Sequence, residues 1–115
     1  MQHLVFVYGT LRQGESNHHF LASAQLLGVH ETQPTYALHD LGAYPALTKG
    51  QHSIRGEVYL IDSDTLQTLD RLEEVPVEYR RETIETPFGV AWIYLYQDAN
   101  QLDSLIATGD WCQRV

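Results

Sequence analysis

Short apolar runs, each bounded by polar or turn-forming residues, predict that much of the chain forms β-strands. The first run lies in the segment Leu4–Leu11, where β-branched and aromatic residues stop at Gly9, a composition typical of a strand covered on both faces. Five further candidate strands follow along the chain: Leu26–Val29, Pro34–Leu38, Ile54–Ile61, Tyr79–Thr86 and Val90–Tyr96. Gly56, inside one of them, indicates a bulge or a close approach of another backbone.

The last two strands are predicted to form a hairpin around a turn at Pro87–Gly89. In Val90–Tyr96 the alternate residues of both faces are apolar, which predicts a central strand. The segment Asp40–Pro45 is rich in turn formers and is predicted to be a surface loop.

Helical spacing of apolar residues appears in three shorter segments. The first is Glu15–Gln25. The second runs from Asp62 to about Glu73 or Glu74, where Val75-Pro76 ends it. The third is a turn or two over Leu102–Ala107 that ends at Gly109. Trp111 is expected to pack as a plug near the end of the chain. Six strands with two or three short helices predict an α+β fold, with residues 1–115 as one domain.

Glu73 lies on the apolar side of the predicted helix that starts near Asp62. At about 100° per residue, with Leu66 at zero, Leu69 falls near about 300° and Glu73 near about 340°, between the two leucines. Burial disfavours the charged form of a carboxyl group and raises its pKa. A carboxyl group poised nearer to neutral pH suits general acid–base catalysis. The alternative is that the helix frays before Pro76 and that Glu73 is merely solvated.

The turn after the first strand, Tyr8-Gly9-Thr10-Leu11, is a candidate anion site. Gly9 has no Cβ, so another group can approach its backbone closely. Successive backbone N–H groups in such a turn form a concave site for an anion. The alternative is an ordinary tight turn without a ligand.

Composition and charge restrict the classes of partner. The net charge of −8 argues against a protein that binds the phosphate backbone of nucleic acids. No apolar stretch approaches the roughly 20 residues that span a bilayer. Cys112 is the single cysteine and no leader-like segment opens the chain, so we expect a soluble, cytoplasmic protein.

The remaining polar residues give weaker signals. The six histidines are scattered without a His-x-x-x-His spacing, so no metal site is predicted. No serine or cysteine lies in a nucleophile-elbow motif, so covalent catalysis is unsupported. Tyr79 is as compatible with the core as with a site.

Several motifs, taken in order, resemble one family. Val5–Leu11 is followed by Arg12, Gly14 and Asn17-His18, and further matches are Gly42–Ala46, Gly56–Tyr59, Leu69–Glu73 and Glu78–Arg81. Together they cover most of the chain and resemble the gamma-glutamylcyclotransferase-like superfamily, in particular the branch of gamma-glutamylamine cyclotransferases and small bacterial relatives. The resemblance implies a small mixed β-sheet barrel flanked by short helices.

The resemblance also implies a reaction and its site. A gamma-glutamyl cyclotransferase releases 5-oxoproline from gamma-glutamyl amines or related gamma-glutamyl compounds, without a cofactor or metal. Glu73 would be the catalytic acid and base, and the small-molecule substrate would be bound by these residues: Tyr8, Gly9, Thr10, Leu11 and Tyr79. The family usually has a small residue where this chain has Glu74, whose charge would raise the pKa of Glu73 further or perturb the loop. The alternative function is a catalytically silent domain of the same fold that binds a small metabolite.

Overall fold

The computed structural model describes residues 2–98, 102 and 104–113. Its strands are β1 Gln2–Val7, β2 Gln25–Glu31, β3 Tyr36–Asp40, β4 Pro45–Lys49, β5 Arg55–Asp62, β6 Tyr79–Thr86 and β7 Gly89–Tyr96. The helical elements are the 3₁₀ turn η1 His18–Leu21, the α-helix α1 Ser63–Leu72 and the 3₁₀ turn η2 Trp111–Gln113.

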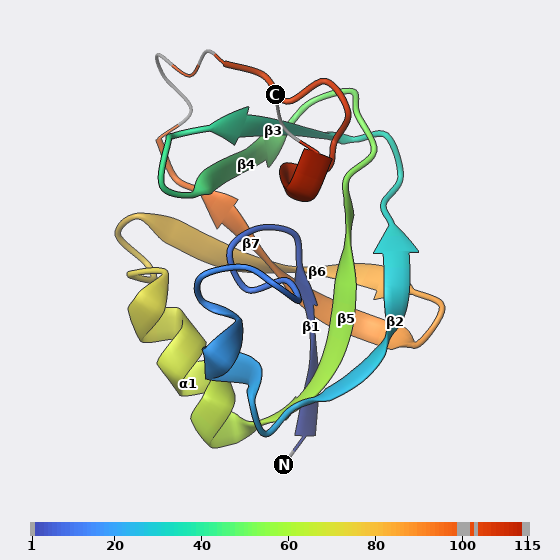
Figure 1. Ribbon diagram of the computed structural model, residues 1–115, viewed down its shortest axis with the longest axis vertical. Coiled ribbons are helices and arrows are strands. Elements are labelled where there is room, and N and C mark those ends of the chain that lie inside the picture. The colour runs from blue at the N-terminus through green and yellow to red at the C-terminus, as the bar shows by residue number, and fades with distance from the viewer. Residues whose placement is uncertain (1, 99–101, 103, 114–115) are drawn as a thin grey trace.

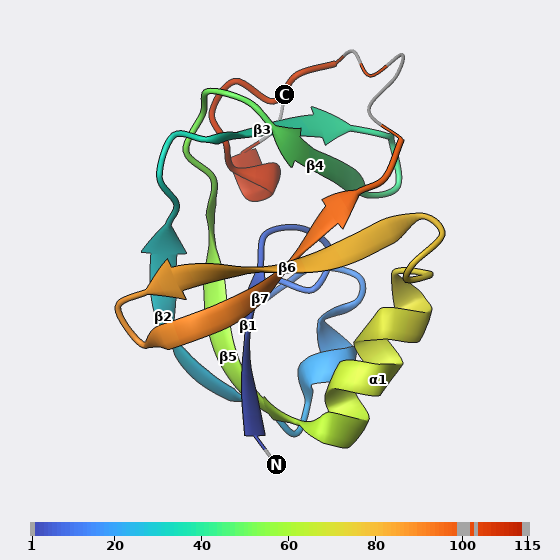
Figure 2. The same ribbon diagram turned by 180° about the vertical axis from the view of Figure 1, so that it is seen from behind.

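Five strands form one mixed sheet in the order β2-β5-β1-β7-β6, and β3 and β4 form a separate two-stranded sheet. β1 runs antiparallel to β5 and parallel to β7, and β7 pairs with β6 as the predicted hairpin. Figures 1 and 2 show the β3–β4 hairpin at one end of the molecule and α1 toward the other. The predicted α+β fold with short flanking helices is confirmed, and the mixed sheet that was expected as a small barrel has β2 and β6 as its edge strands.

β1 is covered on both faces, as its composition predicts. Val5 packs in one buried cluster with Leu69 of α1, whereas Phe6 packs in a second buried cluster with Leu38 of β3. All four of these side chains are removed from water, so the end of β1 is held rigidly in the core. The loop that follows β1 therefore starts from a fixed position.

Two further predictions about strands are confirmed. β7 lies between β1 and β6, and its Ile93 and Leu95 are completely buried. At Gly56 an added Cβ would lie 2.3 Å from the carbonyl oxygen of Val7, so the backbones of β1 and β5 approach too closely there for any side chain.

The helix predicted over Glu15–Gln25 is confirmed only in part, as a short 3₁₀ turn that follows Asn17. Only the short turn η1 is helical, and β2 begins at Gln25 because residues from there on pair with β5. Before η1 the chain folds back on the loop, where the Asn17 N–H donates to the Thr10 carbonyl oxygen at 2.8 Å. Pairing with the sheet and with the loop thus overrides the helical spacing of the apolar residues.

Two segments near the β3–β4 hairpin also differ from the prediction. The surface loop predicted over Asp40–Pro45 is confined to residues 41–44, because Asp40 ends β3 and Pro45 begins β4, a strand that was not predicted. The helical turn predicted over Leu102–Ala107 is wrong in its described part, where the Ile106 N–H donates to the carbonyl oxygen of Leu38 at 2.8 Å and the chain runs along β3. Residue 103 lies outside the described residues.

The end of the described chain closes the core. Trp111 is 1% exposed and packs in the same cluster as Phe6, which confirms its predicted role as a plug. In the part of the chain that the structure describes, no helix has the length and apolar character needed to cross a membrane.

Candidate active site

A cavity of about 340 Å³ lies where the end of β1, the β3–β4 turn and the loop after α1 meet. All of the residues that the sequence suggests for the site line this cavity: Tyr8, Gly9, Thr10, Leu11, Glu73 and Tyr79. Three segments that are distant in the sequence are thus brought together around one hollow.

The loop Tyr8–Leu11 lines this cavity along its whole length. Its turn is closed by a hydrogen bond from the Arg12 N–H to the Gly9 carbonyl oxygen at 3.0 Å, and Asn17 donates through its side-chain amide to Thr10 Oγ1 at 3.0 Å. The N–H groups of Gly9, Thr10 and Leu11 have no acceptor among the described residues. Oriented, unused N–H groups of this kind can bind an anion.

Gly9 is required by a close contact with Pro45. A Cβ added at Gly9 would lie 2.6 Å from Cγ and 2.9 Å from Cδ of the Pro45 ring. The first residue of β4 therefore packs directly on the loop, and any side chain at Gly9 would push the two apart.

Two buried tyrosines form the inner wall of the cavity. Tyr8 donates from its hydroxyl to the carbonyl oxygen of Tyr94 at 2.7 Å, and Tyr79 donates to the carbonyl oxygen of Pro45 at 2.6 Å. Burial raises the pKa of both hydroxyls, and the charge of Glu73 adds to the rise in each case. Tyr79 is therefore a core residue that also faces the cavity, so the two readings of the sequence are compatible.

Glu73 is the residue that caps the C-terminal end of α1. Its N–H still donates to the carbonyl oxygen of Leu69 at 2.9 Å, so helical geometry extends to this position and the helix does not fray before it. The side chain is half-buried in the cavity wall. Burial, and secondarily the charge of Glu78, raise its pKa from 4.5 to about 7.

The nearby carboxylate that raises the pKa of Glu73 is Glu78 and not Glu74, so of the two effects expected of Glu74 the effect on this pKa is not found. Glu74 is exposed and has a left-handed backbone with φ of 51°. This turn continues with the N–H of Glu78 donating to the Glu74 carbonyl oxygen at 2.9 Å, which brings Glu78 back to the cavity. In the sequence, Glu78 is indicated only by its place directly before Tyr79 in a family-like motif.

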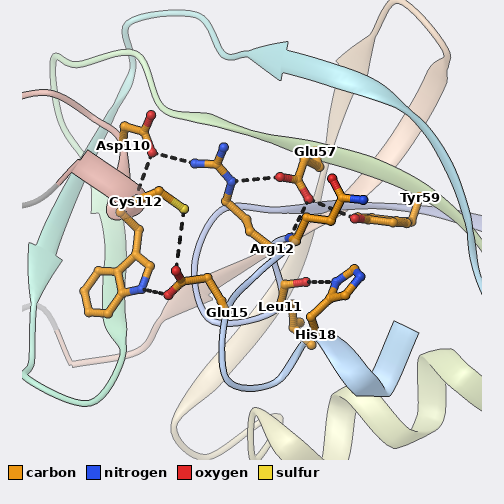
Figure 3. Close-up of polar contacts among 10 residues, drawn as sticks. Leu11, Arg12, Glu15, His18, Glu57, Tyr59, Asp110 and Cys112 are labelled. Atoms are coloured by element: carbon orange, nitrogen blue, oxygen red, sulfur yellow. Dashed lines mark hydrogen bonds and ion pairs between the residues drawn. The ribbon is translucent and has the colours of Figure 1, made fainter. Parts of the chain in front are cut away.

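A second group of polar side chains, centred on Arg12, anchors the loop Tyr8–Leu11 (Figure 3). Arg12, which directly follows the loop, is only 8% exposed, and its guanidinium pairs through Nε with Glu57 at 3.2 Å and through Nη1 with Asp110 at 2.5 Å. Glu57 also accepts from the Gln13 N–H at 3.0 Å and the Tyr59 hydroxyl at 2.8 Å. The loop is thereby fixed to β5 and to the end of the described chain.

The charges that line the cavity are all negative. The described lining residues include Glu73, Glu74 and Glu78 but no lysine, arginine or histidine. Among the described residues, no three acidic, histidine or cysteine side chains are placed to share a metal ion. The site thus combines backbone donors, a carboxyl group that titrates near neutrality and two further carboxylates.

Comparisons with known proteins agree on one relationship. A family model described as "Gamma-glutamyl cyclotransferase, AIG2-like" matches residues 5–113. A protein of Vibrio cholerae is 70% identical over the full length of both chains, and the Escherichia coli "Gamma-glutamylcyclotransferase family protein YtfP" is 44% identical over 96% of each. The crystal structure of an uncharacterised Pyrococcus horikoshii protein matches 95% of this chain and 89% of its own, with a TM-score of 0.81 and 30% identity.

Proposed function

The chain belongs to the gamma-glutamyl cyclotransferase, AIG2-like family, and on that premise we propose that it releases 5-oxoproline from gamma-glutamyl amines or related gamma-glutamyl compounds. The observation that carries the proposal is the half-buried carboxyl group of Glu73 in the cavity wall, whose pKa is raised to about 7. Such a group is present in both protonation states near neutral pH, as a proton shuttle requires.

In this proposal, the loop Tyr8–Leu11 binds the α-carboxylate of the gamma-glutamyl group. The N–H groups of Gly9, Thr10 and Leu11, which have no acceptor among the described residues, support that assignment, because no cationic side chain of the described residues lines the cavity. The packing of Pro45 on Gly9 keeps the loop in place.

The reaction needs no nucleophile from the protein. The substrate's α-nitrogen attacks its own γ-carbonyl carbon, forming the C–N bond of a five-membered lactam, and the bond from that carbon to the amine nitrogen breaks. Because the attack is intramolecular, holding the substrate in a folded conformation supplies much of the acceleration.

Glu73 moves the proton that the reaction requires. Its ionised form accepts a proton from the α-ammonium group, which frees the lone pair for attack, and its protonated form then delivers that proton to the departing nitrogen. The new ring nitrogen releases a second proton to water, and the free amine takes up one from water. Glu73 thus returns to its starting state, and protons balance.

The test is a panel of gamma-glutamyl amines, gamma-glutamyl peptides and glutathione, with 5-oxoproline as the measured product. We expect Glu73→Gln to lower turnover by about 10²–10⁴ because glutamine keeps the shape but cannot carry a proton. The charge-matched control is Glu85→Gln, an exposed position on β6 that does not line the cavity, and it should react like the wild type.

Two results would contradict the proposal. Absence of 5-oxoproline from the whole panel, together with equal binding of the same compounds to the wild type and Glu73→Gln in calorimetry, would favour a metabolite-binding domain. For Glu74→Gln we expect only a several-fold change in turnover. A large loss of turnover in Glu74→Gln, together with full activity in Glu73→Gln, would show that the proton shuttle is assigned to the wrong residue.

A further inference from the structure

We propose that the mouth of the cavity selects gamma-glutamyl compounds whose amine part carries a second, cationic group, and that Glu78 and Tyr44 are the residues that recognise it. The inference rests on the proposed function and concerns the leaving part of the substrate. It assigns to Glu78 a role in specificity that is separate from the proton transfer at Glu73.

The first observation is the pair that Glu78 and Tyr44 form across the cavity. Tyr44 lies in the β3–β4 turn and Glu78 in the loop between α1 and β6, and Figures 1 and 2 show these two segments on the same side of the molecule. The Tyr44 hydroxyl donates to Glu78 Oε1 at 2.5 Å, and both residues line the cavity. The hydrogen bond holds a carboxylate next to an aromatic ring at the cavity mouth.

This combination suits an ammonium group. The carboxylate of Glu78 has a second oxygen and further lone pairs that Tyr44 does not use, and these can accept N–H donors. Tyr44 is 37% exposed and its ring lies 6.4 Å from the ring of Tyr79, so aromatic surface lies beside the carboxylate and is partly open to solvent. A cation over an aromatic face is attracted to it, whereas an anion is not.

The charge distribution of the cavity also favours a cationic amine part. Its described charged lining residues are all acidic, with Glu74 and Glu78 in the loop that follows Glu73. The gamma-glutamyl head would place its carboxylate on the backbone donors of Tyr8–Leu11, away from side-chain charge. A second carboxylate on the leaving amine would instead meet negative side chains, and electrostatic repulsion would weaken its binding.

The test uses three gamma-glutamyl amides of matched length that differ only in the charge at the end of the amine part. The amine parts are 1,4-diaminobutane, which leaves a free ammonium group, pentylamine, which is neutral, and 4-aminobutyrate, which leaves a carboxylate. We expect kcat/KM to be highest for the cationic compound and lowest for the anionic one, with about a tenfold difference between these extremes at low ionic strength.

The effect of each variant is measured as a ratio of kcat/KM values for two substrates. In Glu78→Gln and Tyr44→Phe, the ratio of kcat/KM for the cationic to the neutral compound should fall about threefold or more, and Glu78→Gln should show the larger fall. The ratio removes any effect of a variant on proton transfer, since all three compounds react at the same atoms. Glu85→Gln removes an equal charge outside the cavity and should leave the ratio unchanged.

Equal kcat/KM for the three compounds in the wild type, or an unchanged ratio in Glu78→Gln, would overturn the inference. If no compound is turned over, the proposed reaction fails, but calorimetric titration of the wild type and Glu78→Gln with the same compounds still decides the charge preference. Tighter binding of the cationic compound that is lost in Glu78→Gln would then support the inference, and equal or absent binding would refute it.

Discussion

Replacing Glu73 by glutamine should remove turnover and at the same time stabilise the protein above neutral pH. A tenfold change in an acid dissociation constant corresponds to about 1.4 kcal/mol, so the rise in the Glu73 pKa from 4.5 to about 7 corresponds to about 3 kcal/mol. The native state therefore binds the proton more tightly than the unfolded chain does.

The sign of the pH dependence follows from this difference. Below about pH 4.5 Glu73 is protonated in both states and costs nothing. As the pH rises toward 7, the unfolded chain ionises first and the free energy of unfolding falls, and above about pH 7 the full loss of about 3 kcal/mol is reached. Glutamine stays neutral, so Glu73→Gln should match the wild type near pH 4.5 and exceed it by up to about 3 kcal/mol at pH 8.5.

Urea denaturation of the wild type, Glu73→Gln and Glu85→Gln at several pH values between 4.5 and 8.5 measures this effect. Comparing variants at the same pH cancels the contributions of other titrating groups. A difference between Glu73→Gln and the wild type that stays constant over this range would refute the reasoning, because it would mean that burial does not raise the pKa of Glu73. Loss of turnover combined with a gain in stability would show that the carboxyl group is kept at a cost to stability.

Three further outcomes follow from the same site. The kcat/KM of the wild type should rise with pH around a midpoint near pH 7, since the ionised Glu73 accepts the first proton. Glu78→Gln should move this midpoint to lower pH, and an unmoved midpoint would contradict the influence of Glu78. Gly9→Ala, whose methyl would meet the Pro45 ring at 2.6 Å, should raise KM and lower the free energy of unfolding by about 1–3 kcal/mol, as measured by product release and urea denaturation. Arg12→Leu removes the cation that pairs with two buried carboxylates and should cost about 3–5 kcal/mol in urea denaturation. A loss below about 1 kcal/mol would show that their remaining hydrogen bonds suffice.

The parts of the fold that depend on local pattern could be predicted from the sequence. The direction of Glu73 follows from the spacing to Leu66 and Leu69 on one helix, and the central position of β7 follows from its two apolar faces. Both features need only the periodicity of a single element.

The features that the sequence did not predict depend on contacts between distant segments. β4 begins with a proline after a turn-rich stretch, and it becomes a strand because it pairs with β3 and packs on Gly9. Glu78 reaches the cavity through the left-handed turn at Glu74, a residue type that rarely adopts this conformation, so no local rule indicates it. The sequence could therefore identify the central residue of the candidate site but not the rest of its wall.

The ion pairs of Arg12 also bear on when the cavity forms during synthesis. Arg12 and Asp110 are 98 positions apart, and Gly109 accepts a backbone hydrogen bond from Arg55 at 2.8 Å. As a nascent chain leaves the ribosome, β1 and its loop emerge first, but their partner at position 110 emerges near the end of the described chain. The loop Tyr8–Leu11 can reach its final, fully supported position only after translation has passed Asp110, so the cavity is completed late, after most of the sheet has been synthesised.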